Sequence, residues 1–170
     1  MKLTKEQLTE LISYIDEATL IDDRDREIQK HKQSDLYYSK RHIPGEHDYW
    51  HYKRIKNNLT DFIGSLTNRN VEDMTALHRI KYYTGDGNKP HTDQSDYTIV
   101  IILNSDCKGG QLILNDIPQL DFNQTGDYIM YNGGLERHSV TPITEGTREV
   151  LVAWYKNSNR NNISNTKSII

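Results

Sequence analysis

The sequence predicts a mainly β domain of the sandwich or jelly-roll class with flanking α-helices. From Met74 onward, short runs rich in β-branched and aromatic residues follow one another, and glycine, proline, asparagine or aspartate separates them. At the N-terminus, by contrast, apolar residues have helical spacing. The expected strands lie at about 74–83, 97–104, 111–114, 126–131, 137–141 and 147–155. Many short strands at such close spacing are typical of packed antiparallel sheets.

The N-terminal region is expected to supply helices that cover a sheet. Its apolar residues at helical spacing are Leu8, Leu11, Ile12 and Ile15. Thr4 precedes them and Gln7 follows three residues later, which is typical of a capping box, so a helix is predicted over 4–20. The charged stretch 22–47 lacks steady periodicity and predicts a loop with short ordered pieces. A second helix is expected at about 49–66.

The length fits one domain. A chain of 170 residues buries roughly two-thirds of its unfolded surface on folding, which is enough for one core. We expect residues 1–73 to form a helical support region with a loop, and residues 74–155 to form the β core. Residues 156–170 contain five asparagines and predict a polar C-terminal tail outside that core.

Composition excludes several classes of function. The formal net charge of -3 comes from 21 basic and 24 acidic residues spread along the chain, so general nucleic-acid binding is not expected. Cys107 is the only cysteine, which rules out a disulfide within the chain and favours a reducing compartment. No apolar run reaches signal-peptide or membrane-span length. A cytoplasmic protein without membrane contact is therefore predicted.

Three residues form a candidate metal site. His91 and Asp93 follow a turn-rich stretch, and residues two apart in an extended segment point the same way, so both can reach one ion. His138 would add a third ligand from a later strand. A His-x-Asp triplet alone also occurs on solvated loops. Two imidazoles and one carboxylate on one face of an ion, however, leave the other face open, as in non-haem Fe(II) oxygenases.

Arg148 makes this interpretation more specific. It lies ten positions after His138, on a run whose alternate residues share a face. These residues are Arg148, Val150, Val152 and Trp154. An arginine among apolar neighbours needs an anionic partner, and Glu145 or Glu149 is the ordinary candidate. The guanidinium fork also suits the far carboxylate of a dicarboxylic keto acid whose other end chelates iron.

The motifs resemble those of the prolyl 4-hydroxylase-like branch of the Fe(II)/2-oxoglutarate-dependent dioxygenases. The resemblance spans residues 74–155, about half the chain, and keeps the order of the motifs. The matching text is YYTGDGNKPHTD (82–93), TIVIILN (98–104), GGQLIL (109–114), TGDYIMYNG (125–133) and RHSVTPITEGTREVLVAWY (137–155).

The resemblance implies a double-stranded β-helix in which His91, Asp93 and His138 bind Fe(II) and Arg148 grips 2-oxoglutarate. Tyr83 matches a family tyrosine that lies near the cosubstrate. In such enzymes 2-oxoglutarate and O₂ are consumed, succinate and CO₂ are released, and an unactivated C–H bond is hydroxylated, with ascorbate as a possible reductant. The presence of Asp93 indicates a hydroxylase rather than a related halogenase.

The substrate pocket is less closely specified. Asn88 stands where the family often carries an aromatic residue at the substrate entrance, and Ile102 and Leu112 stand where some members have polar groups that contact the cosubstrate. Trp154 is a candidate pocket wall or ordinary core.

Charge near the expected pocket gives a hypothesis on substrate choice. Arg79 and Lys81 share a strand face with Tyr83, which predicts either a basic edge leading to the metal, with a preference for acidic substrates, or a solvated edge strand. We assign no chemistry to Gly109-Gly110, Gly126 and Gly133-Gly134, which are expected to shape turns. The remaining histidines, His31, His42, His47, His51 and His78, are expected to be structural or exposed.

Three functions follow. The first is a hydroxylase of a peptidyl residue, with proline favoured by the resemblance, acting on a peptide or protein. The second keeps the same chemistry on a free amino acid or another small metabolite. The third is a metal-binding jelly-roll module without turnover, which would have no use for Arg148. The aromatic-rich segment 37–52 is either a substrate lid or packs against the helices.

Overall fold

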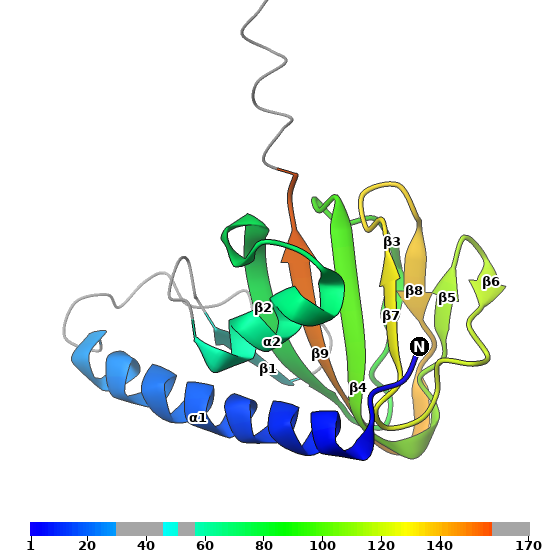
Figure 1. Ribbon diagram of the computed structural model, residues 1–170. Coiled ribbons are helices and arrows are strands. Elements are labelled where there is room, and N and C mark those ends of the chain that lie inside the picture. The colour runs from blue at the N-terminus through cyan, green and yellow to red at the C-terminus, as the bar shows by residue number, and fades with distance from the viewer. Residues whose placement is uncertain (30–45, 51–56, 158–170) are drawn as a thin grey trace, which may run out of the picture.

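The computed structural model describes residues 1–29, 46–50 and 57–157 (Figure 1). Its helices are α1 (Lys5–Gln29) and α2 (Asn58–Thr67), with a short 3₁₀ helix η1 (Val71–Asp73). Its strands are β1 (Glu46–Trp50), β2 (Met74–Tyr82), β3 (Asn88–His91), β4 (Tyr97–Gly109), β5 (Leu112–Leu114), β6 (Ile117–Pro118), β7 (Tyr128–Tyr131), β8 (His138–Val140) and β9 (Ile143–Tyr155).

The strands form two antiparallel sheets. The larger has the order β1-β2-β9-β4-β7 and the smaller the order β3-β8-β5-β6. Figure 1 shows α1 and α2 on one face of the larger sheet, while the smaller sheet lies on its other side. The chain is therefore mainly β with flanking helices and has a double-stranded β-helix, or jelly-roll, fold, which confirms the predicted fold class.

Two apolar clusters lie on opposite faces of the larger sheet, because side chains alternate along a strand. On β9, Leu151 and Ala153 face the helices and join a cluster with Leu11 of α1 and Ile63 of α2. The intervening residues, such as Val152, face the smaller sheet and join the other cluster. A functional group of the larger sheet that points into the space between the sheets must therefore share the face of Val152.

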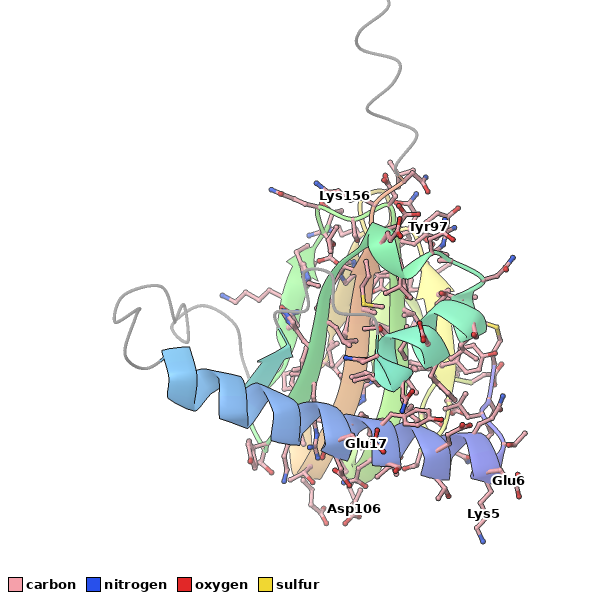
Figure 2. The ribbon with its side chains drawn as sticks, turned by 60° about the vertical axis from the view of Figure 1, so that its left-hand side comes forward. Lys5, Glu6, Glu17, Tyr97, Asp106 and Lys156 are labelled. Carbon is pink, nitrogen blue, oxygen red and sulfur yellow. The ribbon has the colours of Figure 1, made fainter. Side chains whose placement is uncertain are left out.

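The two ends of the larger sheet can be located by the residues labelled there. Figure 2 shows Tyr97 and Lys156 at one end and Asp106 at the opposite end. The same view shows α1 crossing the sheet, and the Asn58 amide of α2 donates a hydrogen bond to Glu17 of α1 over 3.3 Å. The two helices are thus fixed to each other as well as to the sheet.

Both helices begin at capping boxes, but their bounds differ from those expected. The backbone N–H of Thr4 donates to Gln7 Oε1, and that of Gln7 donates to Thr4 Oγ1, as predicted. The first helix continues to Gln29 instead of ending at 20. The stretch beyond 20 lacks apolar periodicity, yet it is rich in straight-chain residues that favour helix.

The helix expected at 49–66 begins only after Asn57, whose side chain caps it by accepting from the Thr60 N–H. Residues 46–50 are instead strand β1, antiparallel to β2 with Glu46 opposite Lys81. The other edge of β2 pairs with β9, so β1 completes the hydrogen bonding of an otherwise open edge.

Strands β3 and β6 were not expected, because Asn88, Lys89 and Pro90 have low strand propensity and β6 has only two residues. No helix in the described parts of the chain is long and apolar enough to cross a bilayer. Several predicted features lie outside the described residues: most of the tail (158–170), His31, His42, His51, and Tyr37, Tyr38 and Tyr52 of the aromatic-rich segment.

Candidate active site

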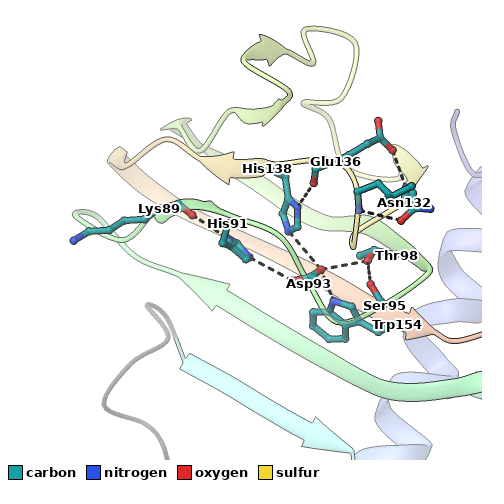
Figure 3. Close-up of polar contacts among 10 residues, drawn as sticks. Lys89, His91, Asp93, Ser95, Thr98, Asn132, Glu136, His138 and Trp154 are labelled. Atoms are coloured by element: carbon teal, nitrogen blue, oxygen red, sulfur yellow. Dashed lines mark hydrogen bonds and ion pairs between the residues drawn. The ribbon is translucent and has the colours of Figure 1, made fainter.

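The three predicted metal ligands lie together at neighbouring strands of the smaller sheet. His91 ends β3 and His138 begins β8, and the two are direct partners in the antiparallel ladder. One ligand atom from each of His91, Asp93 and His138 lies within 4.8 Å of the others. The Nε2 atoms of His91 and His138 are each 3.4 Å from an oxygen of Asp93 (Figure 3).

Backbone carbonyls set the tautomers of both histidines. His91 Nδ1 lies 2.7 Å from the carbonyl oxygen of Lys89, and His138 Nδ1 lies 3.0 Å from that of Glu136. A carbonyl only accepts, so Nδ1 carries the hydrogen in each ring and Nε2 is free to bind a metal. The Nε2 lone pairs then face carboxylate oxygens, and acceptors that face each other repel unless a cation lies among them.

A proton and a metal ion compete for that cationic position. Hydrogen bonding to Asp93 raises the pKa of His91, although burial opposes the increase. Burial alone would raise the pKa of Asp93, but hydrogen bonds from His138 and His91, when a proton occupies Nε2, and from Trp154 outweigh it and hold that pKa well below its usual value. Asp93 is thus ionised at neutral pH, as a metal-binding carboxylate must be.

Trp154 holds the Asp93 carboxylate from the larger sheet. Its indole N–H donates to Asp93 Oδ2 over 2.7 Å, and the hydroxyl of Thr98 donates to the same oxygen over 3.3 Å. Trp154 was predicted as a pocket wall or core residue. The structure adds a contact that sequence spacing does not reveal, because the two residues are 61 positions apart.

Gly133 lets the loop after β7 approach this carboxylate. The Asp93 N–H donates to the Gly133 carbonyl over 2.7 Å. A Cβ at Gly133 would lie 2.4 Å from Thr98 Oγ1, 2.5 Å from Ser95 Oγ and 3.0 Å from Asp93 Oδ2, so a larger residue does not fit. We expected this glycine only to shape a turn. The Gly-Gly pair after a strand was the available signal for such a close approach.

We predict that Trp154→Phe weakens metal binding, because it keeps the ring but removes the N–H that orients Asp93. Loss of such an outer contact typically costs about 10- to 100-fold in metal affinity. Calorimetric titration of the metal-free chain with Mn²⁺ measures the change. Tyr97→Phe, an aromatic change away from Asp93, provides the matched control. Equal Mn²⁺ affinity in Trp154→Phe and the wild type would contradict this orienting role.

Arg148 is buried inside the barrel with one nitrogen unpaired. Only 3% of the residue is exposed, and its Nη2 atom has no hydrogen-bond partner in the described part of the chain. Burial lowers the pKa of its guanidinium, against the opposing effect of Tyr82 and Cys107. A buried cation without a counter-charge is costly, so this position is complementary to an anion.

The two nearby carboxylates considered as ordinary partners of Arg148 bind elsewhere. Glu149 forms an ion pair with Arg79, and Glu145 forms one with Lys108 over 2.6 Å. Alternation explains both pairs, since Glu149 is one residue and Glu145 three residues from Arg148 on β9, and residues at odd spacing face the opposite way. Glu145 and Glu149 are therefore not partners of Arg148.

Tyr131 connects the triad with Arg148. Its ring centroid lies 5.0 Å from that of His138. Burial raises the pKa of Tyr131, as do the charge of Asp93 and the nearby Tyr82, whereas Arg148 lowers it. One buried tyrosine thus interacts with both the candidate metal ligands and the candidate anion site. Sequence reasoning did not single it out.

Tyr82, not Tyr83, lies beside Arg148. Tyr82 is directly opposite Arg148 in the β2–β9 ladder and is 4% exposed, whereas Tyr83 follows the end of β2 and is 41% exposed. The tyrosine beside Arg148 is therefore Tyr82, and the role of Tyr83 near a cosubstrate stays a prediction. A shift of one residue moves a side chain to the other face of a strand.

The strand face of Arg79 and Lys81, predicted to be either a basic edge leading to the metal or a solvated edge strand, is the side of β2 that faces the helices. Arg79 is opposite Leu151, whose side chain belongs to the cluster beneath the helices, and it pairs with Glu149. Lys81 shares that face. Asn88 lies on β3 opposite Val140, three residues before His91, and is partly buried. Of the proposed pocket residues, only Trp154 contacts the candidate metal ligands through a described hydrogen bond.

Comparison with known proteins identifies the fold. No family model matches the sequence, and no curated protein matches it. A prolyl hydroxylase from Trichoplax adhaerens, solved in complex with a hypoxia inducible factor oxygen degradation domain peptide fragment, has a TM-score of 0.60 and 16% identity, over 96% of this chain and 84% of that one. A Pseudomonas putida prolyl-4-hydroxylase has a TM-score of 0.54 and 16% identity, over 82% and 87% of the two chains.

A third similar structure is an oxidoreductase of the 2OG-Fe(II) oxygenase family from Burkholderia pseudomallei. It shares 19% identity with a TM-score of 0.48, and the match covers 59% of this chain. The chain spans about half the length of that protein, 51%. At these identities the likeness establishes the fold, and the chemistry has to be argued from the site.

Proposed function

We propose that the chain is an Fe(II)/2-oxoglutarate-dependent dioxygenase. The observation that carries this proposal is the buried, unpaired Nη2 of Arg148 in the same interior as the His91, Asp93 and His138 triad. A metal site alone would fit a binding module, but that module would gain nothing from a buried guanidinium that contacts the Phe122 ring and leaves Nη2 without a hydrogen bond. A dicarboxylic keto acid satisfies both sites, since one end chelates a metal and the other pairs with arginine.

The residues present fit Fe(II). His91, Asp93 and His138 would hold it through two imidazole nitrogens and one carboxylate oxygen, and three ligands leave room for a chelating cosubstrate. The bound metal supplies the O₂ chemistry that oxidises 2-oxoglutarate to succinate and CO₂ and hydroxylates a C–H bond. Arg148 would bind the distant carboxylate, and Tyr82 is the neighbouring hydroxyl in place of the expected Tyr83.

Other residues would hold this arrangement in place. The carbonyls of Lys89 and Glu136 fix the two imidazoles, and Trp154 and Thr98 fix the carboxylate. Residues 74–155 would form the catalytic core and residues 1–73 its helical support, with 156–170 as a tail. Within that support, Leu11 and Ile63 pack on the outer face of the core sheet.

Succinate formation tests the reaction class. The purified full chain with Fe(II), ascorbate, 2-oxoglutarate and O₂ should produce succinate, and omission of Fe(II) should abolish it. Calorimetry should show 2-oxoglutarate binding to the Mn²⁺-loaded chain. A chain that binds metal but neither binds 2-oxoglutarate nor forms succinate would instead be a metal-binding module.

Peptidyl proline is the proposed substrate. Two proteins with this fold are prolyl hydroxylases, and one was solved with a peptide. A proline-containing peptide array, followed by mass spectrometry for the gain of one oxygen atom, tests this class. Free amino acids in parallel reactions test the small-metabolite alternative. Turnover of free amino acids without turnover of any peptide would overturn the peptide proposal and leave the reaction class intact.

A further inference from the structure

Cys107 lies on the same side of the larger sheet as Arg148. In the β4–β9 ladder Ser105 is opposite Arg148 and Cys107 is opposite Gly146, so both β4 residues point into the barrel. The partly buried Cys107 packs against the cluster between the sheets, which confirms this direction. The thiol and the guanidinium are therefore diagonal neighbours on adjacent strands.

Gly110 lies beside both groups. A Cβ at Gly110 would lie 2.5 Å from Ile143 Cδ1, 3.0 Å from Arg148 Cδ and 3.8 Å from Cys107 Sγ, so the Arg148 and Cys107 side chains border the same backbone position. Gly146, opposite Cys107, has no side chain to cover the sulfur. Burial raises the pKa of the Cys107 thiol, and the charge of Arg148 opposes part of that increase. The unpaired Nη2 of Arg148 indicates, independently of the cysteine, that a ligand binds here.

We propose that Cys107 forms part of the wall of the carboxylate site at Arg148 and is a modification site coupled to it. Bound 2-oxoglutarate shields the thiol, and a modified sulfur blocks the cosubstrate. This inference rests on the proposed function, because it takes 2-oxoglutarate as the carboxylate.

The modifying reagents are electrophiles and peroxide. With iodoacetamide, a sulfur–carbon bond forms, the carbon–iodine bond breaks, iodide leaves and the thiol proton goes to solvent. With hydrogen peroxide, the thiolate attacks one oxygen, the O–O bond breaks, and sulfenic acid and hydroxide form. Because burial raises the thiol pKa, the thiolate is scarce at neutral pH, and either reaction should accelerate as the pH rises.

The chain has one cysteine, so alkylation reports on one site. The Mn²⁺-loaded full chain is treated with iodoacetamide at mildly alkaline pH, with and without 2-oxoglutarate, and the mass increase is followed over time. At about 100 times its Kd, 2-oxoglutarate should slow alkylation at least about tenfold, because few molecules remain unliganded. The chain unfolded in guanidinium chloride should react at one rate with or without 2-oxoglutarate.

Two variants and a binding measurement complete the test. Arg148→Gln should lose the shielding at the same 2-oxoglutarate concentration. Alkylated wild type should bind 2-oxoglutarate at least about tenfold more weakly by calorimetry, since bulk is added beside the guanidinium. In Cys107→Ser, iodoacetamide treatment should cause no change in that affinity.

The outcomes separate this inference from the proposed function. Wild type that calorimetry shows to be saturated with 2-oxoglutarate, yet is alkylated at the unliganded rate, would overturn the role of Cys107 and leave the dioxygenase proposal standing. The same holds if alkylated protein binds 2-oxoglutarate normally. Absence of any 2-oxoglutarate binding to the metal-loaded chain would overturn both.

Discussion

Asp93→Ala is expected to abolish coupled hydroxylation and to weaken metal binding at least about 100-fold, which exceeds the effect of losing an orienting contact alone. The substitution removes the only carboxylate of the triad and also leaves the Trp154 N–H without its acceptor. Mn²⁺ titration and succinate release coupled to product measure the two effects separately.

A matched substitution controls for the loss of a negative charge. Asp121→Ala removes an exposed carboxylate in a turn and should leave the Mn²⁺ affinity unchanged. Added formate can supply a carboxylate ligand to Asp93→Ala and should restore part of the metal affinity. Full activity of Asp93→Ala without any added carboxylate would remove Asp93 from the metal site.

The His91 and Asp93 part of the triad could be predicted because its geometry is local, whereas the pairing of His138 with His91 joins distant segments. His91 and Asp93 are two residues apart, and His138 lies on a strand that the turn residues around it delimit. The β core was predictable for a similar reason. Runs such as 97–103 are rich in β-branched residues, and their apolar residues do not follow the spacing of a helix. What the sequence could not specify was pairing between distant segments, as in the Trp154 contact with Asp93.

Strand direction at the end of a run could not be predicted from the sequence. Strict alternation from buried Ile102 would place Ser105 and Cys107 outside the barrel. A register shift between Ile102 and Asn104 inserts an extra residue and turns both inward. Tyr83 is a different case, because the β2–β9 register is regular from Ala76 to Tyr82 and the family resemblance, not alternation along the strand, selects Tyr83. Bulges and strand ends depend on partner strands, which no local pattern reveals.

Arg148→Gln should weaken the binding free energy of 2-oxoglutarate by about 2–5 kcal/mol, because it removes one partner of a buried charge pair. The Kd should therefore rise roughly 30- to several thousand-fold. The Mn²⁺ affinity measured without 2-oxoglutarate should not fall, since Arg148 is not among the three candidate ligands. The fold should tolerate the change, because the guanidinium Nη2 has no described protein partner to lose.

Arg79→Gln is the matched control for this substitution. It makes the same chemical change on the neighbouring strand, but on the face beneath the helices, where Arg79 pairs with Glu149. Its 2-oxoglutarate affinity should equal that of the wild type. Arg148→Lys keeps the charge but loses the planar fork, so its 2-oxoglutarate affinity should lie between those of the wild type and Arg148→Gln. If Arg148→Gln and Arg79→Gln both retain wild-type 2-oxoglutarate affinity, another cation binds the carboxylate and the assignment of Arg148 fails.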